Sequence, residues 1–252
     1  MPAVPELIAI PAGTIGLRDA RTDSIREVAL RAFSIGRTPI TRAEYAAVTA
    51  GGVDAGRSQE PAHPLTWFDA VRWCNAASAA AGLDPAYELQ GRDAEWDVAA
   101  DGYRLPTEAE WEWACRAGST GPTYGPLSDI AWTAADQADG PQPVALKAAN
   151  DFGVFDMLGN VWEWCWDYAD PARYADYRSL RGGGWADRDW SVRASVRRGS
   201  APDAVLEDVG FRVVRGQVGD PGSQAAQGWS AAADRRRADV RGPLPVGWTP
   251  LR

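Results

Sequence analysis

Nine residues, from Asp156 to Trp164, place the strongest constraint on how this chain folds. They read Asp-Met-Leu-Gly-Asn-Val-Trp-Glu-Trp, and a third indole follows at Trp166. Indole rings favour burial, whereas carboxylates inside a protein need hydrogen-bonding or charged partners. A stretch that mixes the two is predicted to be a polar hub inside the fold, neither a plain core strand nor a solvated loop.

Two interpretations account for the carboxylates of this stretch. Calcium binds carboxylate and main-chain carbonyl oxygens, and a glycine lets carbonyls turn inward. The side chains of Asp156 and Glu163 and the carbonyls of Gly159 and Val161 would fit such a site. Alternatively, the two carboxylates cap or hydrogen-bond local backbone while the indoles fill the core. On the local residues alone, the second interpretation is favoured.

The composition predicts one loop-rich domain and excludes several partners. The chain has 252 residues, enough for one sizeable core, with thirteen tryptophans against five phenylalanines. Because each indole N–H needs a partner, loops and polar contacts should build this core as much as regular layers do. The net charge of −8 argues against general binding to nucleic acids or anionic membranes. The sequence shows no membrane span or signal peptide, so a cytoplasmic location is the default expectation.

Three helices are predicted from their N-terminal caps. Thr41 with Glu44 predicts a helix over 42–49, and Thr107 with Glu110 predicts one that ends near Gly118, because each pair forms a capping box. Thr66 caps a third helix that ends at Gly82. Short strands are expected at 6–17, 28–35, 130–132, 142–146, 179–185 and 209–214, a hairpin-like excursion at 83–103, and a loop at 170–180.

The cysteines and the glutamate cluster have structural explanations. Cys74, Cys115 and Cys165 are widely spaced without a Cys-x-x-Cys pair, so neither a disulfide framework nor a zinc site is supported. Cys74 follows Trp67 at helical spacing and is expected in the core, and Cys165 is expected to be a free, largely buried thiol. The glutamates at 108, 110 and 112 lie at a helix N-terminus, where the helix dipole favours them, so we expect no catalysis from them.

Six segments, in the same order along the chain, resemble the formylglycine-generating enzyme family, also called the sulfatase-modifying factor family. They are Ile10–Thr14, Pro39–Tyr45, Leu105–Gly118, Asp156–Trp164, Arg181–Trp185 and Gly210–Arg212. The resemblance implies an α+β, C-type-lectin-like single domain over residues 1–215, rich in loops, with few short helices and short antiparallel strands. Residues 216–252 lose periodicity and are predicted to be a tail, partly disordered or packed on the domain.

The resemblance also bears on metals. Calcium commonly stabilises members of this family, and the family's calcium loop corresponds here to Asp156, Gly159, Val161 and Glu163. The resemblance therefore favours structural calcium over local capping as the role of these carboxylates. Members that form formylglycine bind copper(I) through two cysteines after the glycine-rich turn, whereas this chain has no cysteine after Cys165. Another branch holds iron with three histidines, and this chain has one histidine. Neither chemistry is therefore expected.

Function is expected to lie in residues 185–198, which follow the glycine-rich turn. This segment is predicted to recognise a peptide, a protein or a small molecule, because indoles offer rigid contact area and charged side chains offer directional contacts. The predicted ligand-binding residues are Trp185, Asp187, Arg188, Asp189, Trp190 and Arg193. A related possibility is a surface segment diversified for binding.

Two alternatives remain open for the same segment. In one, Trp185 belongs to the core and Arg193 and Arg197 form internal salt bridges. In the other, the chain is an oxidative tailoring enzyme with a non-cysteine site, in which Asp187 and Asp189 lie on one side of an extended segment and bind a hard divalent ion. The sequence does not decide whether the chain is an enzyme.

Overall fold

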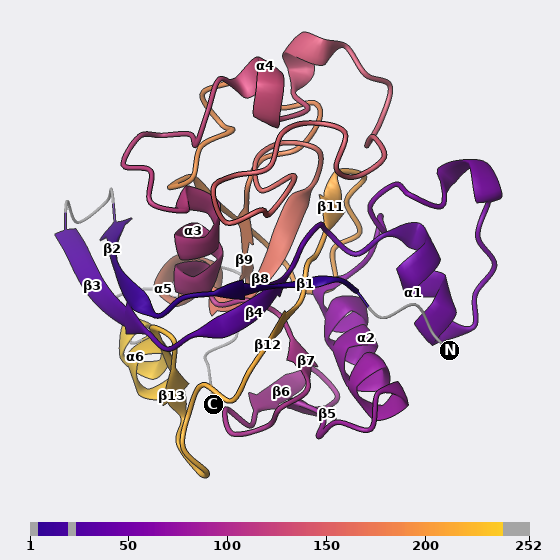
Figure 1. The fold of residues 1–252 in the computed structure, drawn as a ribbon. Helices are drawn as coiled ribbons and strands as arrows, with labels where there is room; N and C mark the ends of the chain where they lie inside the picture. The colour runs from indigo at the N-terminus through magenta and orange to yellow at the C-terminus, as the bar shows by residue number, and fades with distance from the viewer. Residues whose placement is uncertain (1–4, 20–23, 239–252) are drawn as a thin grey trace.

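Two small four-stranded sheets form the centre of the fold in a computed structural model, which describes residues 5–19 and 24–238 (Figure 1). The first sheet has the order β1-β4-β12-β7 and is antiparallel throughout. The second has the order β10-β9-β8-β11, with β11 parallel to β8. Strands β2 with β3, β5 with β6, and β13 with β14 form separate two-stranded pairs.

The strands are short. The first sheet contains β1 (Leu7–Ile10), β4 (Phe33–Gly36), β12 (Val214–Arg215) and β7 (Tyr103–Arg104). The second contains β10 (Arg197–Ser200), β9 (Arg178–Arg181), β8 (Trp162–Tyr168) and β11 (Val209–Gly210). The paired strands are β2 (Gly13–Asp19), β3 (Ser24–Leu30), β5 (Tyr87–Gln90), β6 (Asp93–Trp96), β13 (Ala225–Ala226) and β14 (Trp229–Ser230).

The described helices surround the sheets. Helix α2 lies on one side of the central strands and α3 on the other, and α4 lies with its loops at the top of the view in Figure 1. The helices are α1 (Arg42–Thr49), α2 (Trp67–Ala80), α3 (Glu108–Arg116), α4 (Leu127–Ile130), α5 (Pro171–Tyr174) and α6 (Ala231–Arg237). Two 3-10 turns are η1 (Ala55–Arg57) and η2 (Ala134–Asp136). In the described residues, no helix is both long and apolar enough to cross a bilayer.

The three helices predicted from their caps are confirmed. Each begins after a threonine whose side chain accepts a hydrogen bond from the third helical residue, and each has the reciprocal bond of a capping box. Helix α2 ends at a cap residue, Ala81, that is followed by Gly82 with a φ of 69°. These helices form as predicted because their start signals are local.

Several strand predictions are wrong. Residues 28–35 divide between β3, which pairs with β2, and β4, which pairs with β1 and β12. Ile130 ends helix α4, and 142–146 forms no strand. The N–H groups of Gln142 and Ala145 bond instead to the side chains of Asn160 and Asp156, so a strand ladder is replaced by contacts with the hub. The predicted loop at 170–180 contains α5 and the start of β9.

The core is rich in indoles, and polar contacts hold several of them as predicted, whereas the buried N–H groups of Trp96 and Trp166 have no partner among the described residues. Trp67, Trp111 and Trp164 have at most 1% of their surface exposed. The N–H of Trp67 donates to the Cys165 carbonyl at 3.0 Å, that of Trp164 to the Leu65 carbonyl at 3.3 Å, and that of Trp111 to the Glu163 carboxylate at 2.7 Å. Burial therefore does not leave these indole donors without acceptors.

Glu110 caps α3 as expected, and all three glutamates of this helix also form ion pairs with partners that the sequence did not identify. Glu110 binds Arg104 through two hydrogen bonds of 2.7 Å, and both side chains are buried. Glu112 pairs with Arg181, and Glu108 with Arg197. The last pair matches the internal salt bridge that was considered for Arg197.

Part of the predicted tail packs against the domain. Trp229 of β14 lies 5.7 Å from Trp166 and 5.3 Å from Trp96 between ring centroids. Thr107, the cap of α3, donates through its hydroxyl to the carbonyl of Gln227 at 2.8 Å. Residues 239–252 of the predicted tail lie outside the described residues.

Candidate functional site

Glu163 and Arg212 form the centre of the hub. Nε and Nη2 of Arg212 donate to the two Glu163 carboxylate oxygens at 2.6 and 2.7 Å. Arg212 also donates to the carbonyl oxygens of Gly36, Phe155 and Asp156 at 3.0 to 3.1 Å. The buried carboxylate is therefore neutralised by a guanidinium that also ties the hub to the end of β4.

Asp156 and Asn160 fix the backbone around this pair. Asp156 Oδ2 accepts from the Ala145 N–H at 2.7 Å, whereas its buried Oδ1 has no hydrogen-bond partner among the described residues. Asn160 bonds to both backbone groups of Gln142, at 2.9 and 3.0 Å, and its carbonyl accepts from the Trp185 N–H at 2.8 Å. Asn160 thus links the hub directly to the start of the predicted ligand segment.

The hub contains oxygen atoms of the kinds that calcium prefers. Asp156 Oδ1 is a buried acceptor without a donor, and burial raises the pKa of this carboxyl, so a cation would compensate its charge. The carbonyls of Gly159 and Val161 accept no side-chain hydrogen bond from the described residues. Glu163 Oε2 already accepts from Arg212 and from the Trp111 indole, and Oε1 accepts from Arg212, so one lone pair remains, on Oε1. Calcium here would be structural.

The glycine-rich turn is closed by Asp187. Asp187 Oδ2 accepts from the Trp162 indole N–H at 2.6 Å and from the Gly184 N–H at 2.8 Å. Its carbonyl accepts from the Ala134 N–H at 2.9 Å, which joins the turn to η2. Among the predicted ligand-binding residues, Asp187 is therefore placed to position the turn.

The segment after Asp187 is a series of turns, so the extended segment assumed in the oxidative-enzyme alternative is not present. Hydrogen bonds run from Ser191 to Arg188 and from Val192 to Asp189, with N···O distances of 2.8 and 3.2 Å. The alternation that would place Asp187 and Asp189 on one side is therefore lost. No group of three or more His, Cys, Asp or Glu side chains in the described residues is arranged to hold a metal ion.

Four of the predicted residues, Arg188, Asp189, Trp190 and Arg193, are exposed together. Trp190 has 68% of its surface exposed. We call residues 188–193 the Trp190 loop. Val192 is fully buried, and the Ala194 N–H donates to the Pro122 carbonyl at 2.8 Å, so the loop is anchored just beyond its exposed residues. Trp185 is half-buried, so it matches neither the prediction that it belongs to the core nor the prediction that it is an exposed ligand contact.

The family profile described as sulfatase-modifying factor enzyme 1-like domain matches residues 1–217. The chain belongs to this family. It is 29% identical over 232 residues to the chaperone protein LppX of Paenibacillus barcinonensis, covering 76% of this chain and 83% of that protein. It is 28% identical over 274 residues to the formylglycine-generating enzyme of Streptomyces coelicolor, covering 81% of this chain and 87% of that enzyme.

Solved structures agree with this membership and with the C-type-lectin-like fold. Treponema denticola variable protein 1 superposes with a TM-score of 0.74 and 27% identity, covering 83% of this chain and 94% of that one. CarF superposes with a TM-score of 0.70 and 26% identity, covering 84% and 98% of the two chains. Bovine inactive C-alpha-formylglycine-generating enzyme 2 is 33% identical over 185 residues, covering 63% of this chain and 61% of that protein.

The thiols of this family member are all in its core. Cys74, Cys115 and Cys165 are free and buried, as expected for Cys74 and Cys165. Burial raises the pKa of each thiol far above its ordinary value, which disfavours the thiolate that copper(I) requires. The sequence after the glycine-rich turn contains no cysteine, so the two copper-binding cysteines that the family resemblance would place there are absent.

A pocket beside α1 was not predicted from the sequence. It is lined by His63, the one histidine of the chain, together with Arg42 and Arg57. These residues come from three separate segments, so no local pattern indicated that they meet.

Proposed function

We propose that this member of the sulfatase-modifying factor family is a binding protein that recognises a peptide, protein or small ligand through the Trp190 loop. The single observation that carries the proposal is the 68% exposure of Trp190 on a loop with a fixed base. An exposed indole offers a large contact area, and a preorganised loop loses little entropy when it binds. Arg188, Asp189 and Arg193 of the same loop are also exposed and carry charges of both signs.

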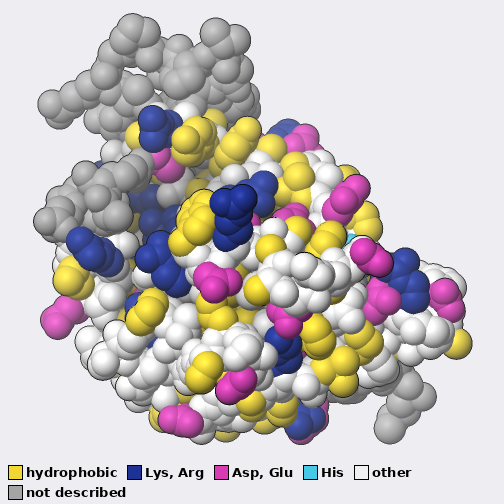
Figure 2. All heavy atoms as spheres, turned by 90° about the horizontal axis from the view of Figure 1, so that it is seen from above, with side chains coloured by type: hydrophobic (Ala, Val, Ile, Leu, Met, Phe, Trp, Pro, Cys, Tyr) yellow, Lys and Arg dark blue, Asp and Glu magenta, His cyan; other side chains and the backbone are white. Residues whose placement is uncertain are grey.

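The rest of the molecule supports a positioned binding surface. Asp187 fixes the start of the loop, and Asn160 connects the preceding Trp185 to the buried hub. The surface seen from the α4 side mixes basic, acidic and apolar side chains, without one dominant charge (Figure 2). Such a mixture favours recognition of a specific ligand over binding to a polyanion.

Phage-displayed peptides selected on the wild-type protein test this proposal. Selected peptides are expected to lose binding to Trp190→Ser and to weaken on Arg188→Ala. Leu146→Ser is the matched control, because Leu146 is also a large exposed apolar residue, at 62%, outside the loop. Peptides that bind all three variants as well as wild type would contradict the assignment to this loop.

The second candidate function is oxidative tailoring, which is favoured by similarity to enzymes. Hercynine oxygenase of Mycolicibacterium smegmatis is 31% identical over 220 residues, covering 69% of this chain and 51% of that enzyme. PvdO of Pseudomonas aeruginosa superposes with a TM-score of 0.67. Metal analysis of protein purified without chelator separates the two candidates. About one equivalent of a redox metal, together with oxygen consumption, would favour the enzyme.

We also propose that calcium braces the hub, as a structural and not a catalytic ion. The unpartnered Asp156 Oδ1, the carbonyls of Gly159 and Val161, and the remaining lone pair on Glu163 Oε1 would form a donor set made entirely of oxygen. An ion there would act on stability and on the placement of Asn160, and through it on the ligand segment.

A further inference from the structure

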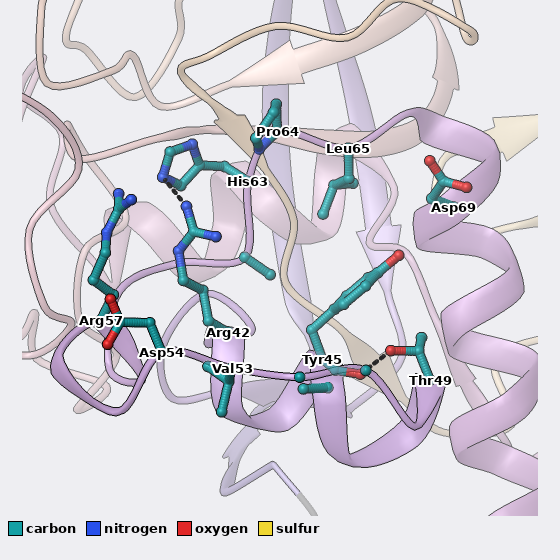
Figure 3. Close-up of a pocket in the computed structure, with 14 residues that line it drawn as sticks. Arg42, Tyr45, Thr49, Val53, Asp54, Arg57, His63, Pro64, Leu65 and Asp69 are labelled. Carbon is teal, nitrogen blue, oxygen red and sulfur yellow. Dashed lines mark hydrogen bonds between the residues drawn. The ribbon is translucent and has the colours of Figure 1, made fainter.

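A pocket of about 390 Å³ lies between α1, the turn that follows α1 and the start of α2. Figure 3 shows Arg42, Arg57 and His63 at one end and Asp69 on α2 at the other, with Tyr45 and Leu65 between them. Its size lies within the range of small-molecule sites. No residue of the Trp190 loop lines it, so the pocket is separate from the surface proposed above.

The acidic side chains of the pocket are already engaged. Asp54 accepts a hydrogen bond from the Gly56 N–H at 2.9 Å. Asp69 accepts from the Thr66 hydroxyl at 2.6 Å and pairs with Arg72 at 3.1 Å. These carboxylates stabilise their own helix starts, so the pocket does not offer a set of free acceptors for a cation.

Arg42, in contrast, has donors to spare. Its Nη2 donates to Nε2 of His63 at 2.8 Å, and its Nε pairs with Glu60 at 3.3 Å. Its Nη1 has no partner among the described residues. An arginine whose plane is fixed by two neighbours and whose remaining N–H groups are unpaired is suited to a carboxylate.

His63 orients this guanidinium without adding charge. Because arginine is always protonated, Nε2 of His63 must be the acceptor in their hydrogen bond. Burial, followed by the charge of Arg42, lowers the pKa of His63 to about 4, so the ring stays neutral near pH 7. Arg57 also lies at this end, where it shares Glu60 with Arg42. Glu60 and Asp54, which lies beside Arg57 in Figure 3, balance the two guanidinium charges, so the unpaired N–H groups of Arg42 are what this end offers to a ligand.

We propose that the pocket binds a small organic carboxylate with an apolar body. The carboxylate accepts hydrogen bonds from Arg42 at the basic end, and the body packs against Tyr45 and Leu65. The acid is either a free metabolite or the C-terminus of a peptide, since both present the same group. Neither the calcium proposal nor the Trp190 loop is needed for this site.

Calorimetric titration with phenylacetate tests the proposal, with phenylacetamide as its neutral counterpart. Phenylacetate is expected to bind, and the amide to bind roughly tenfold more weakly or worse, because it lacks the charge that pairs with Arg42. A peptide ending in phenylalanine, with a free or an amidated C-terminus, distinguishes the two sources. Inorganic phosphate tests whether any anion suffices.

Three variants identify the site. Arg42→Met and the pocket-filling Ala46→Phe should each abolish phenylacetate binding, whereas Arg72→Met, which removes a nearby exposed charge, should retain it. Circular dichroism checks that each variant is folded. If Arg42→Met does not fold, Ala46→Phe still tests the pocket. The proposal would be overturned if the acid and the amide bind equally, or if no carboxylate binds at millimolar concentrations. It would also be overturned if Arg72→Met loses binding as much as Arg42→Met does, or if folded Arg42→Met binds phenylacetate as well as wild type. Trp190→Ser should leave phenylacetate binding unchanged.

Discussion

The guanidinium of Arg212 holds both oxygens of the Glu163 carboxylate, and these side chains are 0% and 1% exposed. The pair joins the start of β8 to the segment between β11 and β12, two parts of the chain that are 49 residues apart. The indole of Trp111 donates to the same carboxylate, so α3 is attached to this point as well. One buried ion pair therefore connects the hub, α3 and both central sheets.

Glu163→Gln is expected to destabilise the protein strongly. It leaves the Arg212 charge buried without a counter-charge, and breaking such pairs typically costs about 3–5 kcal/mol. Urea unfolding followed by fluorescence measures the loss. The double variant Glu163→Gln/Arg212→Met should lose less than the two single losses added together. Arg37→Met, which removes an exposed pair with Glu6, should cost less than about 1 kcal/mol.

Calcium is expected to raise the melting temperature of the wild-type protein, and Asp156→Asn should remove this response. The stabilisation is about 2.7 kcal/mol when free calcium is about 100-fold above Kd. Asparagine keeps an acceptor for the Ala145 N–H and tolerates the φ of 52° at this position, so the variant should fold. A wild-type melting curve that is the same with calcium and with chelator would contradict the calcium site.

Gly159→Ala is expected to disrupt the hub through its backbone. Gly159 has a φ of 73°, and a Cβ there would lie 2.2 Å from the Trp132 carbonyl oxygen. Because that oxygen also accepts from the Asn160 N–H, it has little freedom to move, and a loss of about 2–4 kcal/mol is expected. Gly82→Ala is the control, since its φ is 69° but a Cβ would meet no atom within 4 Å. It should cost about 1 kcal/mol. Similar losses for the two variants would contradict the steric argument.

Asp167 should make stability fall as the pH rises toward neutrality. Burial, followed by the negative charge of Glu108, raises its pKa to about 7, against about 3.9 in an unfolded chain. The folded chain therefore retains a proton over this interval that the unfolded chain has released, so this stabilisation is complete below about pH 4 and lost through about pH 7.

Asp167→Asn isolates this contribution. The amide oxygen still accepts from the Glu108 N–H, which bonds to Asp167 at 2.8 Å in the wild-type protein. The variant should therefore be more stable than wild type at about pH 8, and the difference should shrink as the pH falls toward about 4. Urea midpoints across this range measure it. A difference that does not depend on pH would show that Asp167 does not titrate as proposed.

The sequence predicted what local signals encode. The caps at Thr41, Thr66 and Thr107 defined three helix starts, because the hydrogen bonds involved span three residues. The family motifs predicted the overall fold. The strand expected at 142–146 failed because side chains of Asp156 and Asn160, more than ten residues away in sequence, take up its N–H groups.

The candidate sites required contacts that no pattern in the chain encodes. Arg212 was recognised as part of a motif, but its pairing with Glu163 depends on the packing of distant strands. The pocket at Arg42 and His63 likewise forms only when α1 and the residues before α2 meet. The exposed Trp190 lies in a segment chosen from the sequence, whereas the internal bonds of Asp187 became visible only in the structure.

Asp187 and Asp189, two carboxylates of one segment, are expected to respond differently to substitution. Asp187→Ala removes the acceptor for both the Trp162 indole and the Gly184 N–H, so it should cost about 1–3 kcal/mol in urea unfolding. Asp189→Ala, on the exposed loop, should change stability by less than about 0.5 kcal/mol.

The same substitutions should also differ in the binding of selected peptides. Asp187→Asn should restore much of the peptide binding that Asp187→Ala loses, because asparagine still offers an oxygen to these donors. If the charge of Asp189 contacts the ligand, Asp189→Asn should weaken peptide binding as much as Asp189→Ala does, because both variants remove that charge. A ligand lost equally by Asp187→Asn and Asp187→Ala, at unchanged stability, would show instead that Asp187 contacts the ligand directly.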